Sequence, residues 1–280
     1  MTTPTVDTLR ASGATIHYEV RGSGPILLLI AGGTGGAASF ADVVEDLATD
    51  HTVVTYDPRG IGRSPLDHAD AEQHVAEHAE DAFRLLELLA PGEEARVFGS
   101  SSGAIAALHL ATAHPERIAR VVAHEPPVVE VLPDAADHRA LVARVRETFR
   151  TEGLQPAMAV FAAGVSGDRA DEQRPQPELP PRAAERVARS MADLPYFVGQ
   201  IVPRFMSYVP DLPRLERLSE RLVVAAGEDS HGELPYRAAS VLAERTGAPL
   251  QLFPGGHIGL TTHPEEFGAR LRGVLTTPAR

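Results

Sequence analysis

Cysteine, lysine and tryptophan are all missing from the chain of 280 residues. Without cysteine there is no disulfide, no thiolate metal site and no cysteine nucleophile. Without lysine, Schiff-base chemistry is excluded, including that of pyridoxal phosphate, because it needs a lysine amine. All 26 basic residues are arginines, and the 38 acidic residues bring the formal net charge to −12. We therefore expect neither a nucleic acid nor an anionic membrane as the main partner.

Long apolar segments are missing as well. The N-terminus has neither the basic region nor the apolar region of a signal peptide, and the longest apolar run, residues 26–31, is too short to span a bilayer. The sequence therefore predicts a cytoplasmic protein that needs no metal and no cofactor. With 43% hydrophobic and 23% charged residues the composition is that of an ordinary globular protein, and it leaves a homodimer open.

The hydrophobic pattern alternates between the periods of strands and helices. The predicted strands are residues 15–20, 26–31, 51–56, 95–99, 118–124, 222–226 and 249–253. The predicted helices are residues 40–49, 75–89, 104–113, 236–246 and 264–275. Alternation of this kind, with apolar strands covered on both faces, predicts an α/β fold with a mostly parallel central sheet flanked by helices.

The alternation stops between the fifth and sixth predicted strands. Residues 128–213 contain helical segments and proline-rich stretches but no clear strand. We interpret this segment as a helical lid inserted into a core formed by residues 1–127 and 214–280.

A possible nucleophile lies in Gly99-Ser100-Ser101-Ser102-Gly103, which matches G-x-S-x-G. Such strings also occur by chance, and a serine-rich helix cap is the alternative interpretation. Here a predicted strand precedes the motif and a predicted helix follows it, as the sharp strand-to-helix turn of a nucleophile elbow requires. The glycines fit because bulkier residues would clash within that turn. We therefore predict that Ser101 is the nucleophile and that Ser100 and Ser102 are not.

A glycine-rich loop, residues 32–36, follows the first buried strand. Acyl transfer needs hydrogen-bond donors for the oxyanion, and one is expected from the backbone N–H of Ser102, directly after the nucleophile. We expect the other from Gly33, with Gly32 and Thr34 as alternatives because the register is open. A nucleotide-binding loop is the competing interpretation, but the third glycine of that motif and the P-loop lysine are both missing.

The general base has twelve histidine candidates. His257 follows the last predicted strand and precedes the C-terminal helix, which is where the order serine, acid, histidine places the base. Its role would be to accept the Ser101 proton and to deliver it later to the leaving group. His263 is interpreted as a residue at the start of a helix, and His109 and His114 as structural.

The acid has two candidate positions. The loop after residues 222–226 contains Glu228 and Asp229, either of which could serve, but the acid most often stands three residues past the strand-end glycine, and Ser230 occupies that position. Glu125 ends the preceding predicted strand, at the edge of the sheet where sites of open α/β folds form. We favour Glu125 as the residue that orients the histidine and keep Asp229 as the alternative.

Three segments carry a resemblance to known enzymes: Ser100-Ser101-Ser102-Gly103-Ala104, His124-Glu125-Pro126-Pro127 and Pro254-Gly255-Gly256-His257. In them the chain resembles the α/β-hydrolase superfamily and, more narrowly, the zearalenone lactonases, which open a macrocyclic resorcylic lactone. The resemblance implies a Ser101–His257–Glu125 triad with oxyanion donors at Gly33 and Ser102. It does not extend over residues 128–213, where that family has a tryptophan against its substrate.

The expected activity is hydrolysis of an ester or lactone of a medium-sized hydrophobic substrate through an acyl-enzyme on Ser101. The alternatives are a carbon–carbon bond hydrolase, a biosynthetic cyclase or acyltransferase, and a catalytically inactive ligand-binding protein. The residues expected to bind substrate come from the glycine-rich loop and the lid: Gly32, Thr34, Met158, Phe161, Tyr196, Phe197 and Phe205.

Overall fold

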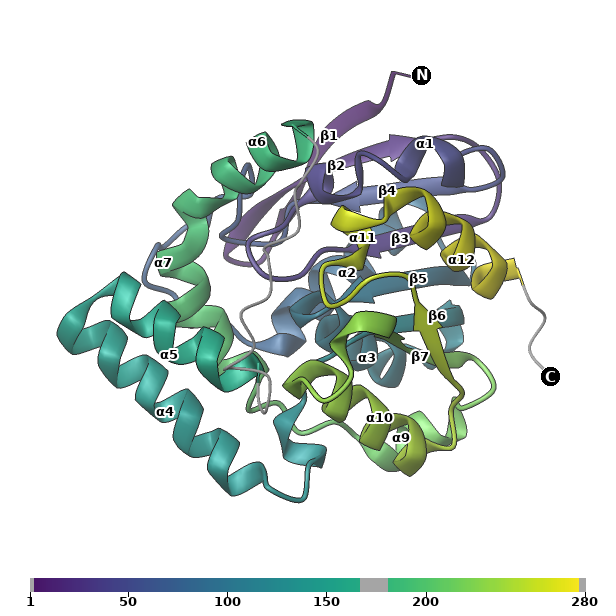
Figure 1. Cartoon of the computed structure of the whole chain (residues 1–280). Coiled ribbons are helices and arrows are strands. Elements are labelled where there is room, and N and C mark those ends of the chain that lie inside the picture. The colour runs from purple at the N-terminus through teal and green to yellow at the C-terminus, as the bar shows by residue number, and fades with distance from the viewer. Residues whose placement is uncertain (1–2, 167–180, 277–280) are drawn as a thin grey trace.

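A computed structural model describes residues 3–166 and 181–276. Eight strands form one sheet in the order β1-β2-β4-β3-β5-β6-β7-β8 (Figure 1). Strand β2 is antiparallel to both of its neighbours, β1 and β4, and all other neighbouring pairs are parallel. This confirms the predicted mostly parallel sheet. The strands are β1 (Thr5–Ala11), β2 (Ala14–Arg21), β3 (Ile26–Ile30), β4 (Thr52–Tyr56), β5 (Ala95–Ser100), β6 (Ile118–His124), β7 (Leu222–Gly227) and β8 (Leu250–Phe253).

Helices cover both faces of the sheet (Figure 1). One face is covered by α2 (Val75–Leu89), α3 (Ser102–Ala113) and α10 (Leu234–Thr246), and the other by α1 (Val44–Leu47) and α12 (Pro264–Thr276). The short α11 (Gly259–Thr262) directly precedes α12.

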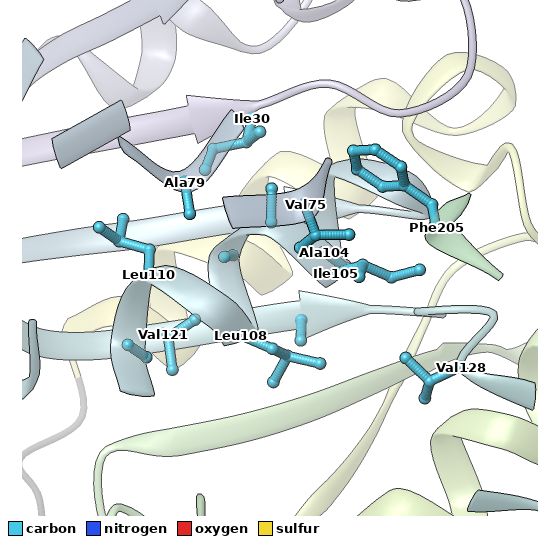
Figure 2. Packing of buried hydrophobic residues seen from close by; sticks show 14 of the residues in the cluster. Ile30, Val75, Ala79, Ala104, Ile105, Leu108, Leu110, Val121, Val128 and Phe205 are labelled. Carbon is cyan, nitrogen blue, oxygen red and sulfur yellow. The ribbon is translucent and has the colours of Figure 1, made fainter. Parts of the chain in front are cut away.

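The central strand β3 shows why these strands are apolar throughout. Leu27 and Leu29 belong to the cluster under α1 and α12, whereas Ile26, Leu28 and Ile30 belong to the cluster under α2 and α3. Successive side chains of a strand point to opposite faces, so a strand covered on both sides needs an apolar residue at every position. Figure 2 shows the packing of side chains in the cluster to which α2 and α3 contribute.

Two details of the prediction were wrong. The segment 40–49 is not a continuous helix but a 3₁₀ turn, Ala37–Phe40, followed by the single turn of α1. Both pieces keep their apolar residues Phe40 and Leu47 buried, which is the feature that the pattern detected. The edge strand β1 was missed because most of its side chains are exposed, so it lacks an apolar pattern and is defined by its pairing with β2.

The chain between β6 and β7 is helical in its described part. It contains α4 (Ala135–Glu152), α5 (Leu154–Ser166), α6 (Pro181–Ser190), α7 (Leu194–Tyr196), α8 (Val202–Phe205) and α9 (Leu212–Arg217). The predicted boundary at residue 213 falls inside α9. Among the helices of the described residues, none combines the length and apolar character that crossing a membrane requires.

Candidate active site

Ser101 lies in the sharp turn between β5 and α3, with φ 54° and ψ −122°. Its N–H donates to the carbonyl of His124 at 2.9 Å, which ties the turn to β6. A Cβ on Gly99 would lie 2.4 Å from the carbonyl oxygen of Gly103, and one on Gly103 would lie 2.4 Å from that of Ile30. The two motif glycines are therefore required by close packing of backbone, and the strained φ of Ser101 follows from the same turn.

Ser101, His257 and Glu125 form one hydrogen-bonded chain. His257 Nε2 lies 3.2 Å from Ser101 Oγ, and His257 Nδ1 lies 2.7 Å from Glu125 Oε2. The Glu125 side chain is fully buried, while that of His257 is 29% exposed. The alternative acid Asp229 is exposed. The structure thus brings the favoured three residues together from β5, β6 and the loop after β8.

The Glu125 carboxylate is held on both sides. Its Oε1 accepts the N–H of Gly227 at 2.8 Å and the hydroxyl of Ser230, and its own N–H donates to the carbonyl of Ala225 at 2.9 Å. Burial by itself raises the pKa of this carboxyl, but the hydrogen bond and charge of His257 and the hydroxyl of Ser230 outweigh it and lower the pKa to about 2. The acid therefore stays ionised at neutral pH.

Ser230 is the residue of this site whose role the sequence did not reveal. It was noticed only because it occupies the position three residues past Gly227, where an acid is more usual. Its contact with Glu125 joins residues 105 positions apart in the chain, so no local pattern could have shown it.

The two expected oxyanion donors lie side by side. The N–H of Gly33 donates to Ser102 Oγ at 3.0 Å, and Ser102 is the first residue of α3. The backbone N–H of Ser102 therefore has no acceptor within its own helix. Gly32 passes so close to the nucleophile that a Cβ on it would lie 2.7 Å from that of Ser101. The glycine-rich loop therefore packs directly against the start of α3.

Thr34 lines a cavity of about 410 Å³ between the glycine-rich loop, the loop after β4 and α6. Asp57, Arg63, Arg186 and Thr261 also line it. None of Ser101, Glu125 and His257 is among its lining residues; in the chain it is linked to the site by Thr34, which follows Gly33, and by Thr261, four residues after His257. Its walls are more polar than expected for a purely hydrophobic substrate.

A buried carboxylate holds the loop after β4 in place. Asp57 accepts the N–H of Ala37 at 2.8 Å, the N–H of Arg63 at 3.0 Å and the guanidinium of Arg63 at 2.8 Å. Burial by itself raises the pKa of Asp57, but these hydrogen bonds lower it by more than burial raises it, so the net shift of the pKa is downward. Arg59 and Asp81 form a second, buried pair with two hydrogen bonds of 2.7 Å.

The large side chains expected to bind substrate contact the protein itself. The hydroxyl of Tyr196 donates to the carbonyl of Arg59 at 3.0 Å, and the rings of Phe161 and Phe197 meet edge to face at 5.9 Å. Met158 is half-buried against the cluster under α2 and α3.

Phe205 is the member of this group nearest to the expected oxyanion donors. It is buried in the cluster drawn in Figure 2 and meets the ring of His78 at 4.9 Å. Together with Gly33 and Ser102 it lines a cavity of about 10 Å³.

The arrangement can perform general acid–base and nucleophilic chemistry. A neutral histidine that contacts a serine hydroxyl on one side and a carboxylate on the other can accept the serine proton, while the carboxylate stabilises the resulting imidazolium. No group of three or more histidine, aspartate and glutamate residues that could hold a metal ion occurs in residues 3–166 and 181–276.

The comparisons with known proteins agree with this fold. The family defined by the alpha/beta hydrolase fold matches residues 25–264, and the chain belongs to that family. It is 35% identical to the uncharacterized hydrolase YraK of Bacillus subtilis (strain 168) over 96% of this chain and 95% of that protein.

Two further similarities span nearly the whole chain. A protein of Caulobacter vibrioides (strain NA1000 / CB15N), whose name assigns it provisionally as the carbamate hydrolase RutD, is 30% identical over 98% of both chains. The structure of a thermophilic esterase from Thermogutta terrifontis superimposes with a TM-score of 0.75 at 19% identity, over 98% of both chains. The protein is thus a hydrolase of the α/β fold.

Proposed function

We propose that the protein is a serine hydrolase that cleaves an ester or lactone through an acyl-enzyme on Ser101. The observation that carries the proposal is the hydrogen-bonded chain from Ser101 through His257 to Glu125, with distances of 3.2 and 2.7 Å. The buried, ionised carboxylate holds the histidine with Nε2 toward the serine, which is the tautomer that can accept a proton.

In the first half of the reaction, Ser101 Oγ attacks the carbonyl carbon as His257 Nε2 takes the hydroxyl proton. The carbonyl oxygen becomes an oxyanion, which the N–H groups of Ser102 and Gly33 stabilise. The Gly33 N–H exchanges its bond to the neutral Ser102 hydroxyl for a stronger bond to a charged oxygen. The carbon–oxygen bond of the ester then breaks, and the leaving alkoxide takes the proton from His257.

In the second half, water replaces the alcohol. His257 removes a proton from the water as the hydroxide attacks the acyl carbon, and the same donors hold the second oxyanion. The bond to Ser101 Oγ breaks, Ser101 recovers its proton from His257, and the carboxylic acid leaves. For a lactone, the alcohol and the acid are two ends of one product.

Residues 128–213 would act as the lid of this site. Two contacts support the assignment: Tyr196 donates to the carbonyl of Arg59, and Asp193 accepts the N–H of Gly62 at 3.1 Å. Both join the insertion to the loop after β4. The 410 Å³ cavity between that loop and α6 would receive the substrate, so we propose a substrate of mixed character, with polar groups toward Arg63 and an apolar remainder.

A carbamate is the second candidate substrate class. It is favoured by the 30% identity to the Caulobacter protein, whose name contains that activity. A carbamate carbonyl would meet the same nucleophile and the same oxyanion donors, so the two candidates differ in leaving group and not in machinery.

A fluorophosphonate probe, together with p-nitrophenyl esters, lactones and carbamates, tests the proposal. We expect the native protein to be labelled and to turn over at least one of these substrates. We expect Ser101→Ala to lose both the labelling and the turnover. Ser100→Ala is the matched control because it removes a hydroxyl from the neighbouring residue, and it should keep both. Labelling that survives Ser101→Ala, or a native protein with neither labelling nor turnover, would overturn the proposal.

A further inference from the structure

Two arginines face each other at the amino end of the sheet, at the opposite end of β5 and β6 from Ser101 and Glu125. Arg96 of β5 and Arg120 of β6 are partners in the parallel register. Two residues further along, Phe98 and Val122 belong to the cluster under α12, so both arginines point to that face. Like charges directly opposite on neighbouring strands are destabilising unless something neutralises them.

No carboxylate of the described chain neutralises Arg120. Arg120 is only 7% exposed as a whole residue, yet its side chain makes no hydrogen bond or ion pair with any residue in 3–166 or 181–276. Burial and the charge of Arg96 both lower the pKa of Arg120 from its ordinary value. None of its nitrogens is among the buried, unpartnered side-chain atoms of the described structure, so the guanidinium reaches the solvent of the neighbouring hollow, where its donors can bind a ligand.

A hollow of about 740 Å³ opens beside this pair, between the amino ends of β6 to β8 and the second half of α12. Arg120 lines it from the sheet and Arg270 from α12. Arg270 is held in place by bonds from Nε to the carbonyl of Leu252 at 3.2 Å and from Nη2 to Gln251 Oε1 at 2.6 Å. Its Nη1 donates to no described residue and thus remains available to a ligand.

The charge of the hollow is positive. Glu220 is the one carboxylate among its described lining residues, and it is exposed and lies beyond ion-pair distance of Arg120. Arg96 adds its charge from behind, where its Nε donates to the carbonyl of Leu275 at 3.1 Å. Two guanidinium groups and one carboxylate therefore line the described part of the hollow, with Arg96 next to Arg120 on the sheet, in a protein whose net charge is −12.

We propose that this hollow is a binding site for a phosphate group, in which Arg120 and Arg270 hold the oxyanion and Arg96 adds to the positive potential. Guanidinium forks bind tetrahedral oxyanions with paired, charge-assisted hydrogen bonds. The Ser219 hydroxyl lines the same hollow and can donate a further bond. The site lies outside the catalytic centre and does not depend on the proposed hydrolase activity.

Inorganic phosphate is the probe, tested against sodium chloride of matched ionic strength. We expect calorimetry to show saturable binding in the millimolar range, and 50 mM phosphate to raise Tm by about 2–5 °C through preferential binding to the folded state. Arg120→Met, which keeps the aliphatic stem, should lose the binding and the shift. Arg150→Met is the matched control, since Arg150 is an exposed arginine of α4 paired with Glu147, and it should keep both.

Two further variants keep the proposal open to refutation if Arg120→Met does not fold. Arg270→Met should weaken phosphate binding about ten-fold, and Glu220→Gln should strengthen it two- to five-fold because it removes the opposing charge. Glycerol 2-phosphate is measured in parallel: tighter binding than for phosphate assigns a small phosphomonoester as the occupant, and equal binding assigns the free ion.

Three results would refute the site. The first is a phosphate effect no larger than that of chloride, and the second is an equal effect in native protein and in Arg120→Met. The third is phosphate that blocks fluorophosphonate labelling of Ser101, because this would place the anion in the catalytic centre. Absence of labelling in the native protein would count against the hydrolase proposal alone.

Discussion

The hydroxyl of Ser230 donates a hydrogen bond to Oε1 of Glu125, while Oε2 of the same carboxylate faces His257. Ser230 follows β7, and Glu125 follows the neighbouring strand β6. Ser230 occupies the position after β7 where an acid is more usual, and there it donates a hydrogen bond to the carboxylate that follows β6. The proposed acid, Glu125, thus lies one strand away from the usual position, and Ser230 at that position contacts its carboxylate.

Removal of this hydroxyl should weaken the site without abolishing it. In Ser230→Ala the buried carboxylate keeps the N–H of Gly227 but loses a charge-assisted hydrogen bond, which is worth about 1.5–3 kcal/mol in general. We expect unfolding free energy to fall by about this amount and kcat by about ten-fold, as measured by urea denaturation and ester turnover. Unchanged values for both quantities would show that the contact contributes nothing.

The choice between Glu125 and Asp229 can be tested by a pair of amide substitutions. Glu125→Gln should lower kcat by about 10³–10⁴, because an amide cannot stabilise the imidazolium and favours the wrong tautomer. Asp229→Asn should keep kcat within about three-fold, because Asp229 is exposed and His257 Nδ1 already bonds to Glu125. The opposite ranking in steady-state assays would assign the role to Asp229.

The hydroxyl of Ser102 is expected to hold the oxyanion loop in register. Its Oγ ties Gly33 to the start of α3, and the loop around Gly33 is rich in glycine and gains little order from its own residues. We expect Ser102→Ala to lower kcat about ten-fold with little change in KM, since loss of a whole oxyanion donor costs about 10²–10³. Ser102→Thr retains the hydroxyl and should recover most of the rate; a kcat that rises in Ser102→Ala would mean that the hydroxyl only competes for the N–H.

Stability should decrease as pH falls below about 6.5. Burial lowers the pKa of His124 to about 4 and that of His78 to about 3, the latter aided by the charge of Arg59. Below the ordinary pKa of histidine, about 6.5, the unfolded chain binds protons that the folded chain does not. Each residue therefore costs about 2 kcal/mol of stability at pH 5 relative to pH 7.

A variant at His124 isolates one of these contributions. His124 packs edge-on against Phe253 and Phe267 with both ring nitrogens unpaired within the described structure, so a phenyl ring suits the site. In His124→Phe, the loss of unfolding free energy between pH 7 and pH 5 should shrink by about 2 kcal/mol, as measured by urea denaturation. His68→Gln, at an exposed histidine, should leave the loss unchanged; an unchanged loss in His124→Phe would contradict the prediction.

Local sequence was sufficient for the parts of the fold whose burial is periodic. The apolar run of β3 and the amphipathic pattern of α2 carry their structure in consecutive residues, and the predicted bounds agree closely with those observed. The exposed strand β1 has no such pattern, because an edge strand with an uncovered face is stabilised by pairing and not by burial.

The sequence by itself determined the features of the site that depend only on neighbouring residues. The spacing of Gly99, Ser101 and Gly103 dictates a sharp turn, since only glycine leaves room for the backbone at both flanks. Tertiary structure alone decided which carboxylate meets His257, because Glu125 and His257 are 132 residues apart in the chain and meet only where β6 and the loop after β8 reach the same edge of the sheet. It also decided that Arg96 and Arg120 lie opposite each other, since a strand's partners are set by the sheet order and not by the strand's own residues.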